Sequence, residues 1–178
     1  TSLNKKYPNP IIQEYINGYG IGTFYLFNEK SDLVTFFGHK RILEEPISGG
    51  PSVIAEPHFN AEAIFYGIKL LKHMGWKGVA MVEFKYDIKR HKPILMEVNP
   101  RFWGSLSLAI DAGVNFPQLL VEYYSPKTHY VKPRIYVKTN IVMIRVLSLL
   151  KTLQTAQTSS EITKYFNSIL YVIKKKRQ

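Results

Sequence analysis

Two short segments, residues 80–84 and 94–101, place the strongest constraint on how this chain folds. Both are rich in apolar residues, and the mostly polar stretch between them predicts a hairpin turn centred near residue 90. An antiparallel hairpin with that centre puts Glu83 directly opposite Glu97. Because two opposed carboxylates repel each other and destabilise a sheet, this pairing indicates that a cation lies between them.

Alternation along the second segment puts further polar side chains beside Glu97. Side chains repeat every two residues on a strand, so Asn99 and Arg101 share the face of Glu97, whereas Met96 and Val98 point into a core. Two carboxylates and an amide suit a hard ion such as Mg²⁺ or Mn²⁺, which usually also binds waters and substrate phosphates. Arg101 is then placed to hold a phosphate or a carboxylate.

The charge of the chain is concentrated in its C-terminal part. The 178 residues have a formal net charge of +11, of which residues 126–178 contribute +10 through 11 Lys/Arg and a single acid, Glu161. We therefore expect a boundary near Ser125, between a nearly neutral region, residues 1–125, and a basic strand and helix extension. Packing of this tail on the rest of the protein is the plain interpretation. Binding to an anionic membrane surface or to nucleic acid is the alternative.

Composition excludes several classes of protein. The chain has no cysteine, which excludes disulfides, thiolate catalysis and cysteine-based zinc sites. No apolar run approaches the length that spans a bilayer, and the first residues lack the apolar core of a signal peptide. We expect a cytoplasmic protein of ordinary globular composition, and whether it forms a homo-oligomer is left open.

Periodicity and turn residues predict an α+β protein that begins with an antiparallel meander. Its strands are expected at residues 11–16, 21–27 and 32–41, with a glycine turn at 17–20 and a loop at 44–52. Asn60 is a suitable N-cap for a helix that ends at Gly75. After the hairpin we expect helices at 105–112 and 116–124, a mostly strand-like stretch at 130–144, and amphipathic helices at 146–153 and 162–173.

At these residues the chain resembles an ATP-grasp domain of the type found in carbamoyl-phosphate synthase large subunits and related carboxylate–amine ligases. The matching segments follow the family's order: residues 13–16 before a glycine turn, residues 39–41, the loop 44–50, Glu83 in a strand, and residues 96–101. The last of these motifs is the most specific. The resemblance covers roughly residues 10–124. It implies an antiparallel sheet flanked by helices, and it says little about the basic helical tail.

The resemblance implies a reaction and a set of ligands. In such enzymes ATP phosphorylates a carboxylate to an acyl phosphate, which an amine or ammonia then attacks. Glu83, Glu97 and Asn99 are implied to ligate one or two Mg²⁺ ions that bridge ATP phosphates. Arg101 is implied to bind the transferred phosphoryl group or the acyl phosphate, and Arg41 to lie near phosphates or substrate.

The segment at residues 13–16 matches the part of the family that passes beneath the adenine and ribose. The resemblance implies that Gln13, Glu14, Tyr15 and Ile16 form this part of the nucleotide site. There a backbone N–H and C=O would read the adenine edge, and the Glu14 carboxylate would hold a polar donor.

Plainer interpretations stay open for the site residues. Glu83 and Glu97 are also typical of solvated charges on an exposed sheet face. Asn99 is typical of a turn before Pro100, and Arg101 of a surface ion pair.

Glu14 is also typical of an ordinary charge on an edge strand. Arg41 belongs to a basic cluster with Lys40, and such clusters usually face solvent. Trp103 lies next to Arg101 in the sequence, and it either lines the substrate pocket or belongs to the core.

The family's usual fold also has an N-terminal lobe whose lysines contact the ATP phosphates. Nothing before Gln13 is long enough to supply it, and Lys5 and Lys6 are poor substitutes. We therefore expect the C-terminal portion of a longer ligase, whose partner is a missing N-terminal lobe and which alone binds ATP weakly and turns over nothing. A nucleotide-binding relative without catalysis, and a protein that acts through its basic tail, are the alternatives.

Overall fold

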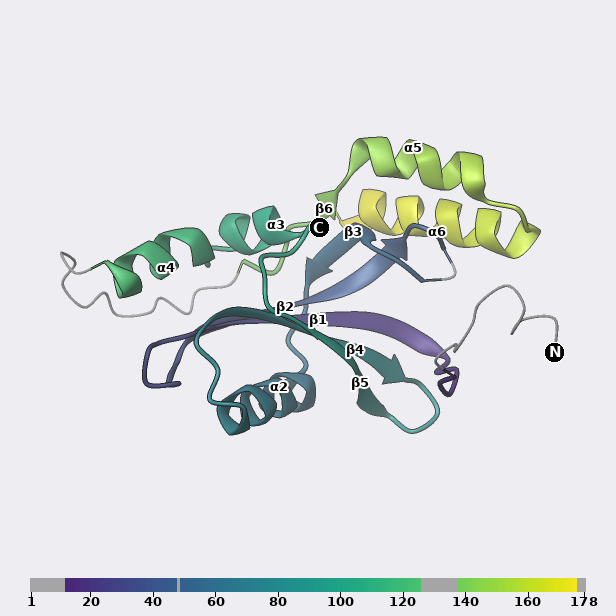
Figure 1. Cartoon of the computed structure of the whole chain (residues 1–178). Helices are drawn as coiled ribbons and strands as arrows, with labels where there is room; N and C mark the ends of the chain where they lie inside the picture. The colour runs from purple at the N-terminus through teal and green to yellow at the C-terminus, as the bar shows by residue number, and fades with distance from the viewer. Residues whose placement is uncertain (1–11, 48, 126–137, 176–178) are drawn as a thin grey trace, which may run out of the picture.

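A computed structural model describes residues 12–47, 49–125 and 138–175 of the chain. One antiparallel sheet of six strands organises this part, in the order β5-β4-β1-β2-β3-β6 (Figure 1). The strands are β1 (Gly18–Phe27), β2 (Leu33–Glu44), β3 (Ser52–Pro57), β4 (Gly78–Asp87), β5 (Lys92–Asn99) and β6 (Met143–Ile144).

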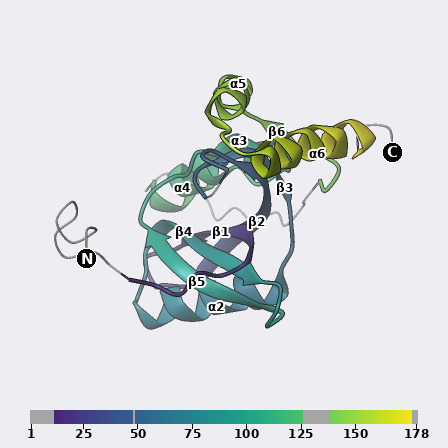
Figure 2. The same cartoon turned by 90° about the vertical axis from the view of Figure 1, so that its right-hand side faces the viewer.

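Helices cover both faces of the sheet. They are α2 (Ala61–His73), α3 (Leu106–Asp111), α4 (Phe116–Tyr124), α5 (Val146–Thr155) and α6 (Ser159–Lys175). Figures 1 and 2 show α2 on one side of the sheet and the other four helices on the opposite side. The predicted α+β class, an antiparallel sheet flanked by helices, is confirmed.

The helix α2 begins and ends where the sequence predicts. Asn60 Oδ1 accepts a hydrogen bond from the backbone N–H of Ala63 at 2.8 Å, which caps the first turn. Gly75 has a φ of 64°, a conformation that favours glycine and ends the helix.

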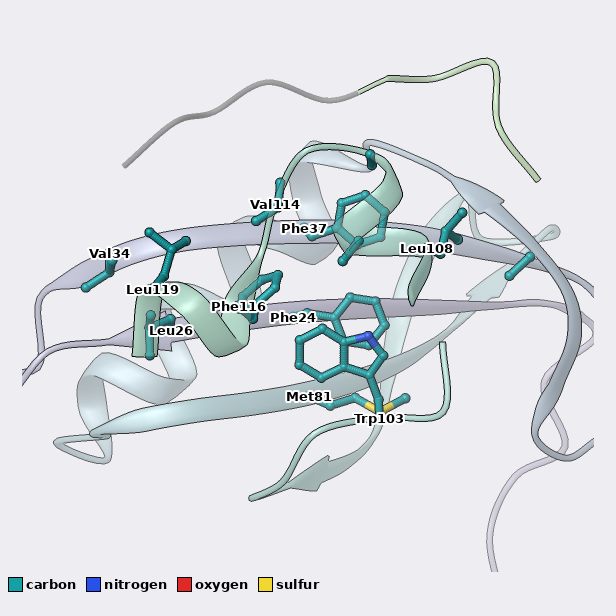
Figure 3. Packing of buried hydrophobic residues seen from close by; sticks show 13 residues of the cluster. Phe24, Leu26, Val34, Phe37, Met81, Trp103, Leu108, Val114, Phe116 and Leu119 are labelled. Atoms are coloured by element: carbon teal, nitrogen blue, oxygen red, sulfur yellow. The ribbon is translucent and has the colours of Figure 1, made fainter. Parts of the chain in front are cut away.

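Alternation along β1 supplies two separate cores. On one face Ile21 and Tyr25 are fully buried against α2, and the Tyr25 hydroxyl donates a hydrogen bond to Ile64 O at 3.1 Å. On the other face Phe24 stacks on Trp103, with ring centroids 4.0 Å apart (Figure 3). Because both faces of β1 are covered, this strand lies at the centre of the fold.

The β4–β5 hairpin has the predicted register at one end and a different register near its turn. Glu83 pairs with Glu97 as predicted, but Phe84 pairs with Leu95, so Met96 is an extra residue in a β-bulge. The bulge removes Met96 from the alternation, and the residue is 51% exposed. The prediction that Met96 points into a core was therefore wrong.

The segment before β1 differs from its prediction. Residues 12–17 form no strand, and residue 11 lies outside the described part of the chain. The glycine turn expected at 17–20 instead contributes to β1, which starts at Gly18. A Cβ at Gly18 would lie only 1.7 Å from Tyr86 O, so glycine here permits the close approach of β1 and β4.

The strands near the C-terminal tail also differ from the prediction. No strand is predicted at residues 52–57, yet β3 forms there and is buried along its whole length. Of the stretch at 130–144, residues 130–137 lie outside the described ranges, and within 138–144 only Met143 and Ile144 form a strand. They pair with β3, so β6 depends on the strand that the prediction missed.

The basic tail packs on the sheet through one face of α6. Tyr165 and Val172 are buried in a cluster that includes Leu43 of β2, which confirms the plain interpretation for this helix. The apolar side of this predicted amphipathic helix is only partly covered, because Phe166 and Leu170 are 51% and 52% exposed. The boundary near residue 125 and the binding of a membrane or nucleic acid stay predictions. Among the described helices, none is long and apolar enough to cross a membrane.

Gly67 provides a test of how closely α2 is held against the sheet. A Cβ at this position would lie 2.1 Å from the hydroxyl oxygen of the buried Tyr25. We expect Gly67→Ala to lower the free energy of unfolding by about 1–3 kcal/mol, although alanine is the better helix former. Denaturant unfolding measures the change.

Gly104→Ala is the matched control for this substitution. A Cβ at Gly104 would meet its nearest neighbour, Arg145 Nη1, at 3.7 Å, which is an ordinary contact distance. This variant should retain wild-type stability to within about 0.5 kcal/mol. Equal stabilities of the two variants would contradict the close packing of α2.

Candidate functional site

A cavity of about 1030 Å³ brings most of the predicted site residues together. Its walls come from the segment before β1, from strands β1, β2, β4 and β5, from the loops around residues 50 and 104, and from the start of α5. Eight predicted residues line it: Gln13, Glu14, Tyr15, Ile16, Arg41, Glu83, Glu97 and Arg101. The remaining one, Asn99, is hydrogen-bonded to Glu97. The structure gathers these residues, and their roles stay predictions.

Arg41 joins two carboxylates that line the cavity, Glu83 and Glu44. Its Nη2 donates to Glu83 Oε2, and its Nη1 donates to Glu44 Oε1 at 3.3 Å and to Gly50 O at 3.1 Å. The Arg41 side chain is only 9% exposed, so the interpretation of Arg41 as a solvent-facing charge was wrong. Two carboxylate partners make the burial of this guanidinium possible.

The Glu83 carboxyl is subject to opposing influences. Burial raises its pKa above the ordinary value, the Arg41 guanidinium acts to lower it, and the charge of Glu97 raises it further. The net direction is upward, so the ionised form of Glu83 is not fully compensated. A cation between Glu83 and Glu97 would favour that ionised form and offset the repulsion.

The end of β5 presents three polar side chains in a chain of hydrogen bonds. Asn99 Nδ2 donates to Glu97 Oε1 at 2.8 Å, and Arg101 Nη2 donates to Asn99 Oδ1 at 3.4 Å. Arg101 Nη1 donates to Phe102 O at 3.1 Å. Both acceptors of Arg101 are neutral oxygens, so the charge of this guanidinium is available to an anion.

The oxygens of Glu83, Glu97 and Asn99 form a small donor set. Within the part of the chain that the structure describes, no group of three or more His, Asp or Glu side chains gathers to hold a metal. Mg²⁺ does not need such a cage, because it usually binds through one or two carboxylates together with waters and substrate phosphates. The residues present therefore fit a Mg²⁺ ion that is shared with a nucleotide.

Glu14 is tied to the β4–β5 turn. Arg90 Nη1 donates to Glu14 Oε2 at 3.1 Å, and the same guanidinium contacts Asp87 at 3.2 Å. The hydrogen bond from Arg90 lowers the pKa of the Glu14 carboxyl. Because residues 12–17 form no strand, Glu14 is not an edge-strand charge. The Arg90 contact ties this segment, which lines the cavity, to the β4–β5 turn, and the role of Glu14 toward a nucleotide stays a prediction.

His39 is a buried part of the cavity wall to which the sequence assigns no role in the site. Its Nδ1 lies 3.0 Å from Ser105 Oγ, and its Nε2 has no hydrogen-bond partner among the described residues. Burial lowers the His39 pKa to about 3, with the charges of Arg41 and His58 acting in the same direction. The imidazole is therefore neutral near pH 7. The alternation of side chains along β2 could have indicated His39 as a site residue, because His39 and Arg41 share a face of that strand.

Two further cations, Lys85 and Arg145, line the cavity without having been predicted. Alternation also points to Lys85, which lies two residues beyond Glu83 on β4. No local pattern points to Arg145, because only the pairing of β6 with β3 brings it to the cavity. Trp103 belongs to the core, where it is only 5% exposed, and it also lines the cavity. Its role in a substrate pocket stays a prediction.

The sequence matches the family described as "ATP-grasp in the biosynthetic pathway with Ter operon" over residues 44–152. This match spans more than half of the chain, and the chain belongs to that ATP-grasp family. None of the curated proteins matches the chain.

Solved structures share the fold at low sequence identity. Rhizobium etli pyruvate carboxylase T882A, crystallised without acetyl coenzyme-A, has a TM-score of 0.58 and 14% identity over 72% of this chain and 14% of its own. The Campylobacter jejuni biotin carboxylase complex with β-γ-ATP has a TM-score of 0.55 and 15% identity over 70% and 29% of the two chains. The Hydrogenobacter thermophilus 2-oxoglutarate carboxylase biotin carboxylase domain, in complex with MgADP and bicarbonate, has a TM-score of 0.55 and 14% identity over 72% and 29%.

These matches confirm the ATP-grasp fold that the motifs indicate, which is the fold of ATP-dependent ligase-type modules. The chain spans only 14% to 29% of the length of these three proteins. The finer resemblance to carbamoyl-phosphate synthase stays a prediction.

His39 gives the fold a measurable dependence on pH. Its pKa of about 3 in the folded protein lies below the ordinary value of 6.5, so below pH 6.5 the unfolded chain binds a proton that the folded chain does not. Stability should therefore fall as the pH is lowered. We expect His39→Gln to flatten this decline between pH 6.5 and 5 by up to about 1.4 kcal/mol per pH unit, as measured by denaturant unfolding.

Two other groups act within the same pH range, and both are present in the variant. Burial also lowers the pKa of His58, which adds to the decline on acidification. The raised pKa of Glu83 acts in the opposite sense, because the folded state then gains a proton more readily. The difference between the two profiles therefore reports on His39, and identical slopes would contradict its burial as a neutral imidazole.

Proposed function

We propose that this chain is the metal-bearing C-terminal portion of an ATP-grasp ligase that binds Mg–ATP and activates a carboxylate as an acyl phosphate. An amine or ammonia then attacks the acyl carbon. The N-terminal lobe of the same protein completes the nucleotide site by supplying the lysines that contact the phosphates.

One observation carries this proposal. Glu83 and Glu97 are paired directly across the β4–β5 hairpin and both line a cavity large enough for a nucleotide and a small substrate. An arrangement in which like charges face each other beside a buried strand is unfavourable by itself. It becomes favourable when a divalent cation is bound between the carboxylates.

In this proposal the residues around the cation have distinct roles. The carboxylates of Glu83 and Glu97 and the side-chain amide oxygen of Asn99 would hold Mg²⁺, and Arg41 keeps Glu83 in place through their ion pair. When bound, Mg²⁺ would neutralise and orient the ATP phosphates. Arg101, whose hydrogen-bond acceptors here are neutral, binds the transferred phosphoryl group or the acyl phosphate.

The proposed reaction has two substitutions. A carboxylate oxygen of the substrate attacks the γ-phosphorus, the bond to the bridging oxygen breaks, and ADP leaves. The amine nitrogen then attacks the acyl carbon, inorganic phosphate leaves with the electron pair of the C–O bond, and the nitrogen loses a proton. Positioning and charge neutralisation by the cavity residues are what such phosphoryl transfer mainly needs.

In this proposal the nucleotide lies against residues 13–16, which line the cavity. Two structural neighbours support the type of ligand: the Campylobacter jejuni enzyme is a complex with β-γ-ATP, and the Hydrogenobacter thermophilus domain is a complex with MgADP and bicarbonate. Binding of ATP and Mg²⁺ by this chain is part of the proposal.

Glu97→Gln tests the metal site. We expect the wild-type chain to bind Mg–ATP in a calorimetric titration and the variant to bind at least about tenfold more weakly, because a neutral amide replaces a charged carboxylate ligand. The stability of the fold should be unchanged or slightly higher, since the repulsion with Glu83 is removed. In the complete ligase the same substitution should abolish nearly all turnover.

Glu29→Gln is the matched control. Glu29 is exposed, pairs with Lys77 at 3.4 Å and lies outside the cavity, so its loss removes the same charge elsewhere. This variant should bind Mg–ATP like the wild type. Equal weakening in both variants, or wild-type binding that does not depend on Mg²⁺, would contradict the proposal. ATP turnover by the isolated chain would contradict the need for the N-terminal lobe.

A further inference from the structure

The cavity carries more positive charge than the proposed reaction uses. Arg41 is neutralised by ion pairs with Glu83 and Glu44. Arg101 and Arg145 both line the cavity, and neither forms an ion pair with a carboxylate among the described residues. The proposed function assigns Arg101 to the reacting group. Arg145 has no assigned partner.

Arg145 reaches the cavity from the opposite edge of the sheet. The two edge strands are β5 and β6, and Arg101 follows β5 whereas Arg145 follows β6. Register shifts between β2 and β3 bend that side of the sheet, and Figure 1 shows β3 and β6 raised toward α6. The bend allows residues from both edges to line a single cavity.

The position of Arg145 is set by its backbone and by the loop after β5. Its backbone N–H donates to Val53 O at 2.9 Å, and its C=O accepts from the Leu149 N–H of α5 at 2.8 Å. Its Nη1 lies 3.7 Å from the position that a Cβ of Gly104 would occupy. The guanidinium therefore lies beside the loop that begins with Arg101, at the cavity wall.

We propose that Arg145 binds a second anionic group of the substrate, so that this ligase acts on carboxylates that carry a further carboxylate or phosphate group. The proposal rests on the proposed function and adds the substrate class to it. A guanidinium binds carboxylate and phosphate through two parallel hydrogen bonds, which suits both kinds of anion.

Arg101 and Arg145 are both exposed, so both guanidinium groups are accessible to anionic groups of a bound substrate. With Arg101 on the carboxylate that is phosphorylated, a second anion at the other end of the substrate meets Arg145. Lys85, the remaining cation of the cavity, lies on the same strand as Glu83, and we assign it to the nucleotide phosphates. The substrate is thus selected by charge at both ends.

A binding experiment with paired probes tests this assignment. The chain is first titrated with Mg²⁺ and the non-hydrolysable analogue AMP-PNP, and then with α,ω-dicarboxylates of three to six carbons, with 3-phosphonopropionate, and with the monocarboxylates of matching length. We expect at least one dianionic probe to bind about tenfold more tightly than its matched monocarboxylate.

Three variants give the result its meaning. Arg145→Gln should remove the preference for the dianionic probe. Arg145→Lys should retain part of it, because lysine keeps the positive charge but lacks the two parallel N–H donors of a guanidinium. Lys69→Gln removes one positive charge from α2, outside the cavity, and should keep the wild-type preference. All variants should bind Mg–AMP-PNP like the wild type.

The outcomes separate this inference from the proposed function. Failure of the wild type to bind Mg–AMP-PNP would overturn the proposed function. Intact nucleotide binding with no preference for any dianionic probe, including no measurable binding of either series, would overturn the role of Arg145. A loss of Mg–AMP-PNP affinity in Arg145→Gln would also overturn it, because Arg145 would then serve the nucleotide.

Discussion

The repulsion between two carboxylates is the constraint on which the rest of this structure depends. Glu83 and Glu97 face each other across β4 and β5, and burial makes the charge on Glu83 costly. Arg41 crosses from β2 to form an ion pair with Glu83, while Glu97 accepts a hydrogen bond from the amide of Asn99. The ion pair with Arg41 offsets the charge of Glu83 only in part, so both carboxylates of the hairpin are available to a cation.

The glycines of β1 explain how side chains from β2 reach that hairpin. Strand β1 lies between β2 and β4, and ordinary side chains on it would block the path. A Cβ at Gly20 would lie 2.7 Å from Arg41 Cδ, and a Cβ at Gly22 would lie 2.6 Å from His39 Nε2. Because these glycines have no side chains, β1 leaves room for the side chains of Arg41 and His39 over the sheet. The segment 18–22 therefore contributes to the shape of the site.

Much of the site can be predicted from the sequence because it depends on local alternation. The pairing of Glu83 with Glu97 follows from a short hairpin, in which few registers are available. The bulge at Met96 could not be predicted, because one inserted residue does not visibly change the pattern of apolar residues in this segment. The glycines at the start of β1 are equally typical of a turn and of a close contact between strands. Arg145 could not be predicted as a site residue, because it reaches the cavity through the pairing of β6 with β3, a strand that is far away in the sequence.

The most direct test of this account is the position of a bound divalent ion. Crystals of the chain grown with Mn²⁺ and a non-hydrolysable ATP analogue allow the ion to be located by its anomalous scattering. We predict a peak between the carboxylates of Glu83 and Glu97, within about 2.0–2.3 Å of an oxygen from each and next to the nucleotide phosphates. A peak bound by other side chains, or nucleotide bound in the cavity with no ion at these two carboxylates, would contradict the account.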